Sequence, residues 1–311
     1  NETAVRMNYS RARVFEETGK PEQAMQALQA FLRDAVTLPD SDRDVESAQV
    51  SLVNLWRQAG RTTDAMPVID HLIGQRTQRL GERDPRTMNA RLARVGLLEA
   101  EGRFEESAAE SKRLLELRTE VLGAEHVDTL TTAQMLANSL LRLGKAAEAL
   151  PYAESAAKGF ATRFGESHAQ TQASLVAMAF AFEETGQSAR AEEIYLRLIA
   201  TQRLSATLHT ESLSVRNNYA MLLHSQKRET EAVAQFQELL PIVEKQLGRN
   251  HPYYAIFQSN YGLCLGAAGN TEQAKRELDE AIKSLQQALG DDHERTRTAR
   301  ERLASLHQGS T

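Results

Sequence analysis

The chain has 311 residues, of which 41% are hydrophobic and only 5% aromatic, and its formal net charge is −5 at pH 7. The charges are interspersed and form no basic block along which a nucleic-acid backbone could bind, so we expect no nucleic-acid partner. Apolar runs extend over only a few residues, which predicts no direct membrane contact. The single cysteine, Cys264, excludes an intramolecular disulfide.

A short polar turn recurs every 41 or 42 residues along nearly the whole chain. The turn residues are Gly19, Gly60, Gly102, Gly144, Gly186, Lys227 and Gly269, and five residues after each stands a small residue: Ala24, Ala65, Ser107, Ala149, Ala191, Ala232 and Ala274. A period of this size is typical of a solenoid, in which each unit buries its apolar face against its neighbours. Because Ala, Leu, Glu, Arg and Gln dominate, we predict an all-α fold.

Each turn is expected to join two antiparallel helices. In chain order, the predicted units cover residues 3–37, 45–80, 87–122, 129–164, 171–205, 212–247 and 254–289, and a capping helix over 294–306 follows them. We predict that they form one superhelical domain over 1–311. The first junction, around Pro39 and Asp40, is degenerate, and the sixth hairpin should be the most irregular because Lys227 replaces glycine.

A bulky side chain stands four residues before most turns and should fill the space between the two helices. We therefore predict that Trp56, Leu140, Phe182 and Leu223 are buried at equivalent positions.

The junctions between units share a histidine slot, occupied by His126, His168, His209, His251 and His293. A Leu-Gly pair precedes three of these histidines, Phe164-Gly165 precedes His168, and Ala206 replaces the glycine before His209. A glycine C-cap, a polar turn and a Thr or Asp N-cap there would stop one helix and start the next. Equivalent residues of a solenoid lie about 10–20 Å apart. Zinc ligands must come within about 2 Å of the ion, so we expect no metal site from these histidines. Cys264 is expected to be a buried core residue, and no catalytic motif or cofactor signature is found.

The turn glycine, the small residue five positions later and the Leu-Gly-x-x-His-Pro junction together resemble the tetratricopeptide (TPR) repeat. The 42-residue form is similar to that of kinesin light chains and their bacterial relatives, with the best matches at Asn217–Ala220 and Val243–Pro252. The resemblance covers residues 3–306. It implies a right-handed superhelix whose concave face, lined by the first helix of each pair, receives a peptide or protein.

The resemblance also implies which residues line that groove, from their distance before each turn. The candidates are Asn54, Arg57, Asn89, Gln134, Asn138, Arg142, Phe180, Asn217, Met221 and His224. Asparagine can bind a peptide backbone and arginine an acidic side chain, as in the Asn138 and Arg142 pair. We expect a ligand with an acidic and an apolar anchor, the latter near Phe180 and Met221. The slot where a chaperone-tail carboxylate clamp needs its first lysine is never basic here, which disfavours that class of co-chaperone.

Three functions follow as hypotheses. The first is a protein- or peptide-binding scaffold with no catalysis of its own. The second is the regulatory or sensor region of a bacterial serine/threonine kinase, which the resemblance implies because arrays of this 42-residue type follow the catalytic domain in such kinases. The chain begins in mid-pattern at Asn1, and we expect it to be part of a longer protein. Its compartment would be cytoplasmic, or periplasmic if the parent chain is a membrane kinase. The third is self-association through an apolar N-terminal edge formed by Val5, Tyr9 and Phe15.

Overall fold

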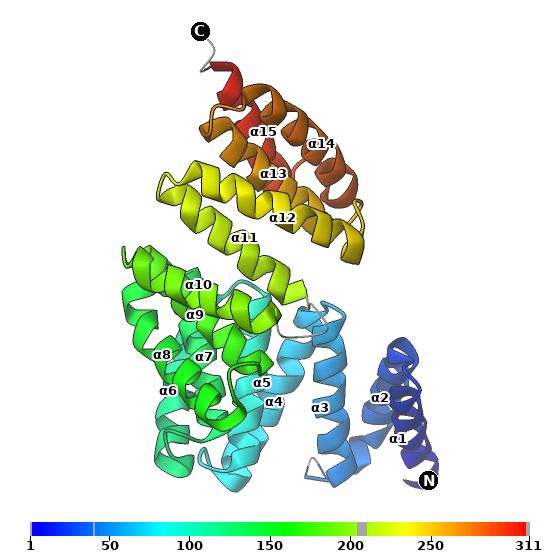
Figure 1. Ribbon diagram of the computed structural model, residues 1–311. Helices are drawn as coiled ribbons and strands as arrows, with labels where there is room; N and C mark the ends of the chain where they lie inside the picture. The colour runs from blue at the N-terminus through cyan, green and yellow to red at the C-terminus, as the bar shows by residue number, and fades with distance from the viewer. Residues whose placement is uncertain (1, 40, 204–209, 309–311) are drawn as a thin grey trace. The chain divides into compact units, whose positions relative to one another are not determined.

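The computed structural model describes residues 2–39, 41–203 and 210–308 (Figure 1). Within these ranges the chain forms fifteen α-helices and one 3₁₀-helix and no strand, which confirms the predicted all-α fold. The helices group into two compact units, residues 1–165 and 166–311. None of the helices in the described ranges is both long enough and apolar enough to cross a membrane.

The first compact unit contains four helix pairs, and each of its helices packs against the next one in the sequence. Its elements are α1 (Glu2–Glu17), α2 (Pro21–Asp34), η1 (Ala35–Thr37), α3 (Arg43–Gln58), α4 (Thr62–Leu80), α5 (Pro85–Ala100), α6 (Phe104–Leu122), α7 (Val127–Arg142) and α8 (Ala146–Phe164).

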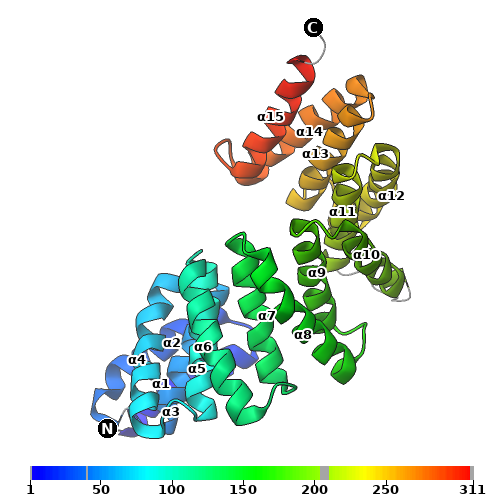
Figure 2. The same cartoon turned by 90° about the vertical axis from the view of Figure 1, so that its left-hand side faces the viewer.

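The second compact unit contains three helix pairs and a final helix. Its elements are α9 (Ala169–Glu184), α10 (Ser188–Arg203), α11 (Thr210–Ser225), α12 (Glu229–Leu247), α13 (Pro252–Ala267), α14 (Thr271–Leu289) and α15 (Glu294–Gln308). The last helix packs on both α13 and α14, as Figures 1 and 2 show, and so occupies the position predicted for a capping helix. The predicted single domain over 1–311 stays a prediction.

The turn inside each pair uses a residue with positive φ. At Gly144, φ is 70°, and the next amide, of Lys145, donates to the carbonyl of Leu140 at 2.9 Å. Lys227 adopts φ 63° and the Arg228 amide donates in the same way to Leu223, also at 2.9 Å. The prediction of an irregular sixth hairpin is therefore wrong, because the lysine backbone adopts the left-handed conformation that glycine takes elsewhere.

The junction histidines act as N-caps. The predicted threonine caps are therefore wrong, since Thr129 and Thr171 lie inside the first turns of α7 and α9, whereas Asp84 does cap α5. The Nδ1 atoms of His126 and His251 accept hydrogen bonds at 3.2 Å from the amides of Asp128 and Tyr253, and His168 and His293 do the same. Each imidazole thus satisfies an amide that the first helical turn leaves without a partner. The remaining junction histidine, His209, lies outside the described residues, as does Asp40 of the first junction.

Trp56, Leu140, Phe182 and Leu223 are all buried, as predicted. The N-terminal edge differs from the prediction, because Val5, Tyr9 and Phe15 pack against the core of their own unit. The Tyr9 ring lies 5.3 Å from that of Phe31, centroid to centroid. Met7 and Val14 are the exposed apolar side chains of this helix instead, at 62% and 55%. The assignment failed because it did not settle which side of α1 faces α2.

Candidate peptide-binding groove

The first helix of the second pair, α3, presents one face to a pocket of about 400 Å³. Val50, Asn54 and Arg57 lie on this face because residues three or four apart on a helix point the same way. Neighbouring helices α4, α5 and α7 complete the wall. The lining residues are Val50, Val53, Asn54, Arg57, Ile69, Arg76, Asn89, Ala90, Leu92, Ala93, Gly96 and Met135. The structure thus brings together three of the ten predicted groove residues, Asn54, Arg57 and Asn89.

Two of these side chains are available to a ligand. Asn54 and Arg57 are exposed, and within the described part of the chain neither has a hydrogen-bond or ion-pair partner. The Oδ1 atom of Asn89 is occupied, since it accepts a hydrogen bond at 2.7 Å from Nη2 of Arg118. An amide and a guanidinium therefore stand free beside an apolar wall that includes Leu92 and Met135.

A second pocket of about 590 Å³ adjoins the first, since both are lined by Val50 and Arg76. Its lining residues are Ser41, Arg43, Glu46, Ser47, Val50, Ser51, Arg76, Arg79 and Arg86. We call the two pockets together the α3 groove. Glu46 neutralises part of the positive charge, because it forms ion pairs with Arg76, at 3.0 Å, and with Arg79. Arg43 has no partner among the described residues, so the groove is positive overall.

Two buried arginines anchor this region and were not among the sequence candidates. Arg76 on α4 and Arg118 on α6 stand 42 residues apart at equivalent positions, and each donates from Nη1 to a backbone carbonyl in the first turn of the next helix. The acceptors are Arg86 at 2.9 Å and Asp128 at 2.8 Å. The signal was present in the sequence as Arg-Thr five residues before each Leu-Gly glycine, Gly81 and Gly123.

The predicted residues on α7 do not line the α3 groove. Asn138 is exposed, Gln134 is half-buried, and the Arg142 guanidinium carbon lies 4.9 Å from the centre of the Phe104 ring. This cation–π contact holds the arginine against the neighbouring helix α6. Met135 is the α7 residue that reaches the pocket.

The predicted residues of the second compact unit are described by themselves. Phe180 on α9 is 41% exposed, and Met221 on α11 is half-buried. Asn217 accepts a hydrogen bond at 2.7 Å from Nδ2 of Asn260 on α13. His224 lies with Nδ1 2.7 Å from Oε2 of Glu229. Both polar candidates on α11 are therefore engaged with side chains of their own unit.

Three residues before their turns, Glu99 and Glu183 are half-buried carboxyls. Burial raises the pKa of both above the usual glutamate range. Hydrogen bonds partly oppose this pKa shift: Glu99 accepts from the Ser139 hydroxyl at 2.9 Å, and Glu183 accepts from the Tyr195 hydroxyl. Neither carboxyl is a fully solvated surface group.

The profile of the tetratricopeptide repeat family matches residues 86–162 and 211–287. The chain carries tetratricopeptide repeats. Each matched TPR segment corresponds to two helix pairs or most of them, α5–α8 in the first case and α11–α14 in the second. A comparison with curated proteins finds no significant match.

Solved TPR structures are similar in fold. A kinesin light chain-like protein from Podosopora anserina with nearly identical TPR-like repeats is 20% identical, with a TM-score of 0.58 over 65% of this chain and 95% of that one. A tetratricopeptide repeat protein from Parabacteroides merdae is 13% identical, with a TM-score of 0.67 over 98% and 99%. The quorum sensor NprR from B. thuringiensis, without ligand, is 14% identical, with a TM-score of 0.65 over 98% and 81%. NprR in complex with its cognate peptide NprX is also similar, at 13% identity and a TM-score of 0.58 over 99% and 84%.

Proposed function

We propose that this TPR protein binds an extended segment of a protein or peptide partner in the α3 groove. The observation that carries the proposal is the pairing of two unpartnered polar side chains, Asn54 and Arg57, with an apolar wall in one pocket. The asparagine amide suits a peptide backbone, and the guanidinium suits a carboxylate. The wall around Val53, Leu92 and Met135 suits one apolar side chain next to that carboxylate.

The charge of the groove favours an acidic ligand. Arg43 and Arg57 are unpaired within the described part of the chain, whereas Glu46 is already shared by two arginines. A segment with one or two acidic residues would meet complementary charge, and a basic segment would be repelled. The complex of NprR with its peptide supports a peptide ligand for this fold, although it is an analogy of fold alone.

A displayed library of random dodecapeptides, selected on the whole chain, tests the proposal. We expect enrichment of peptides that place Asp or Glu next to a large apolar residue. Arg57→Ala and Asn54→Ala should each weaken the selected peptide by about 1–3 kcal/mol, with little change in thermal stability because both side chains are exposed. Arg113→Ala on α6 is the matched control, since this exposed arginine pairs with Glu82 away from the groove. Equal loss in the control, or no loss at Arg57, would refute the assignment.

Three further hypotheses remain predictions. The first is an apolar anchor near Phe180 and Met221, which both belong to the second compact unit. A regulatory role in a bacterial serine/threonine kinase rests on the 42-residue period, and kinase motifs in the sequence upstream of Asn1 would support it. Self-association would use the exposed Met7 and Val14 of α1, and light scattering of the M7E variant would test it.

A further inference from the structure

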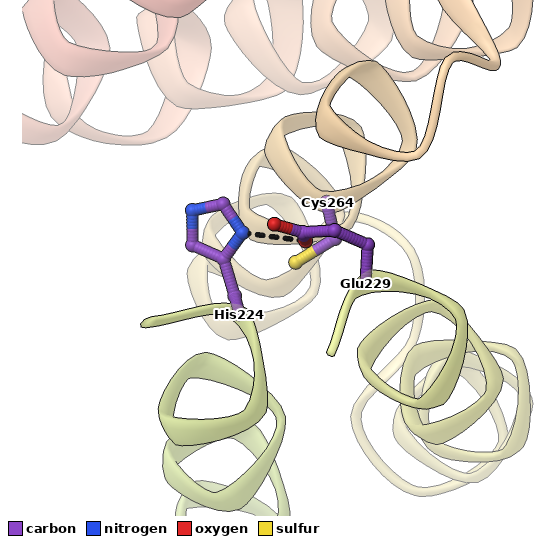
Figure 3. A group of neighbouring side chains, drawn as sticks. All are labelled: His224, Glu229 and Cys264. Atoms are coloured by element: carbon purple, nitrogen blue, oxygen red, sulfur yellow. Dashed lines mark hydrogen bonds and ion pairs between the residues drawn. The ribbon is translucent and has the colours of Figure 1, made fainter. Parts of the chain in front are cut away.

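Three potential metal ligands converge at the turn between α11 and α12. They are His224 near the end of α11, Glu229 at the start of α12 and Cys264 on α13 (Figure 3). One ligand atom from each, Nδ1, a carboxylate oxygen and Sγ, lies within 4.8 Å of the other two. In the part of the chain that the structure describes, this is the only group of three or more such residues that meets these distances.

We propose that His224, Glu229 and Cys264 form a binding site for a zinc ion. Imidazole nitrogen, carboxylate oxygen and thiolate sulfur are the three kinds of ligand that zinc accepts in proteins, and their mixture disfavours the oxygen-only ions calcium and magnesium. Bonds of about 2.0–2.3 Å in tetrahedral geometry place ligand atoms roughly 3.3–3.8 Å apart. The three ligand atoms already lie within 4.8 Å of one another, which is close to these separations. A water molecule or a group from a partner would take the fourth position.

The environment suits an ion that is shielded but reachable. Cys264 is fully buried, whereas the side chains of His224 and Glu229 are 20% and 15% exposed. In Figure 3 the imidazole and the carboxylate point toward each other, and the sulfur lies beside the carboxylate. The Arg302 guanidinium on α15 is the nearby positive charge that acts on Cys264. An ion could enter from the side of the histidine and glutamate.

In an earlier repeat, the positions equivalent to His224 and Cys264 carry side chains with oxygen atoms only. Three residues before its turn stands Glu99, the equivalent of His224, and forty residues further stands Ser139, the equivalent of Cys264. Ser139 donates a hydrogen bond at 2.9 Å to Glu99, and its hydroxyl lies 2.8 Å from that of Ser107. One earlier repeat thus already makes a polar contact between these two positions. The change from Glu and Ser to His and Cys converts it into a set of zinc ligands.

Binding must displace a proton from the cysteine. Burial, followed by the nearby Glu229 carboxylate, raises the pKa of Cys264 to about 12, so the metal-free thiol is protonated at neutral pH. As the sulfur–zinc bond forms, the S–H proton leaves to solvent, and the neutral imidazole contributes its Nδ1 lone pair. The bound ion would join the α11–α12 turn to α13, and so link two consecutive helix pairs.

Equilibrium dialysis of the untagged full chain with Co²⁺, and then competition with Zn²⁺, tests the site. We expect one ion per chain, thiolate-to-cobalt charge-transfer absorption in the near ultraviolet, and a rise in the midpoint of thermal unfolding with Zn²⁺. Loss of an outer-shell partner typically weakens a metal site 10–100-fold. We therefore expect loss of a direct ligand in C264S or H224Q to weaken binding by at least about 100-fold, with the charge-transfer band absent in C264S.

The variants are chosen so that misfolding does not obscure the result. Serine already occupies the equivalent position at Ser139, and His224 is partly exposed, so both substitutions should leave the helix pairs intact. His251→Gln is the matched control, because this histidine lies in the same compact unit and caps α13 without belonging to the cluster. Each variant is compared with its own metal-free form. No stoichiometric binding by the parent chain, or undiminished binding by both C264S and H224Q, would overturn the proposal.

Discussion

Replacing the buried Arg118 with methionine should destabilise the first compact unit, although methionine fills nearly the same space. The Arg118 side chain lies between α6 and the next pair and is only 1% exposed. Its guanidinium donates to the Asp128 carbonyl at 2.8 Å, to the Thr132 hydroxyl at 2.9 Å and to Oδ1 of Asn89 at 2.7 Å. Burial lowers its pKa from the usual arginine value, so the charge is held there against a desolvation penalty.

Two opposing effects determine how much Arg118→Met changes the free energy of unfolding. Hydrogen bonds to a charged group contribute about 1.5–3 kcal/mol each, and three are lost. Removing an incompletely compensated buried charge recovers several kcal/mol of desolvation. Two of the three acceptors would still have a hydrogen-bond partner in the variant. The Thr132 hydroxyl donates to the Asp128 carbonyl at 2.8 Å, and Asn89 is exposed to water. We therefore expect Arg118→Met to lower the free energy of unfolding by about 1–3 kcal/mol, and Arg118→Ala by more because it leaves a cavity.

The loss of stability is measured by thermal unfolding, monitored by circular dichroism. Hydrogen exchange then shows which helices are destabilised. Exchange should accelerate first in α6 and in the first turn of α7. Arg113→Met is the matched control on the same helix, since its ion pair with Glu82 is exposed and should contribute less than about 1 kcal/mol. A methionine variant as stable as the parent would show that desolvation outweighs the three bonds, and the reasoning would be wrong.

Three further outcomes are expected. Leu140→Ala should cost about 2–5 kcal/mol, with hydrogen exchange accelerated mainly in α7 and α8; uniform acceleration over residues 1–165 would contradict nearest-neighbour coupling. Lys227→Gly should leave stability unchanged or raise it by up to about 1 kcal/mol in chemical denaturation, whereas Lys227→Val should lower it; a clear loss in the glycine variant would count against the strain argument. Because burial raises the pKa of Glu99, its favourable contribution to stability is complete below the unfolded pKa and is lost as pH rises through the folded pKa. The stability of Glu99→Gln relative to the parent should therefore increase as pH rises above the usual glutamate pKa of about 4.3, and a constant or decreasing difference in unfolding midpoint would refute this.

The helices and turns were predictable because they depend on short-range chemistry. A left-handed turn residue and a small residue five positions later recur with the period of the fold, and the buried positions of Trp56 and Leu140 follow from the same register. The orientation of α1 was not predictable, because the spacing before its turn does not determine which of its sides packs against α2. Val5, Tyr9 and Phe15 were consequently assigned to the wrong surface.

The candidate groove was predictable only in part. Asn54, Arg57 and Asn89 share a pocket because their spacing places them on facing helices of consecutive pairs. The position of Arg142 depends on Phe104, a contact between helices that the spacing before the turn does not encode. The same is true of His224, whose neighbours Glu229 and Cys264 are supplied by the next helix and by the next pair. The position of a residue relative to its turn predicts the helix face on which it lies. Whether its side chain is available to a ligand depends on contacts with other helices, which this position does not encode.

The unpaired arginines of the α3 groove have a kinetic consequence. On a chain with a net charge of −5, the unpaired Arg43 and Arg57 would attract the acidic peptide that we propose toward the α3 groove. Encounters would then be guided toward productive orientations, and the guidance would fade once added salt shortens the Debye length to about 10 Å or less. The on-rate should fall with ionic strength, while the off-rate, set by the apolar wall and the asparagine, should change little.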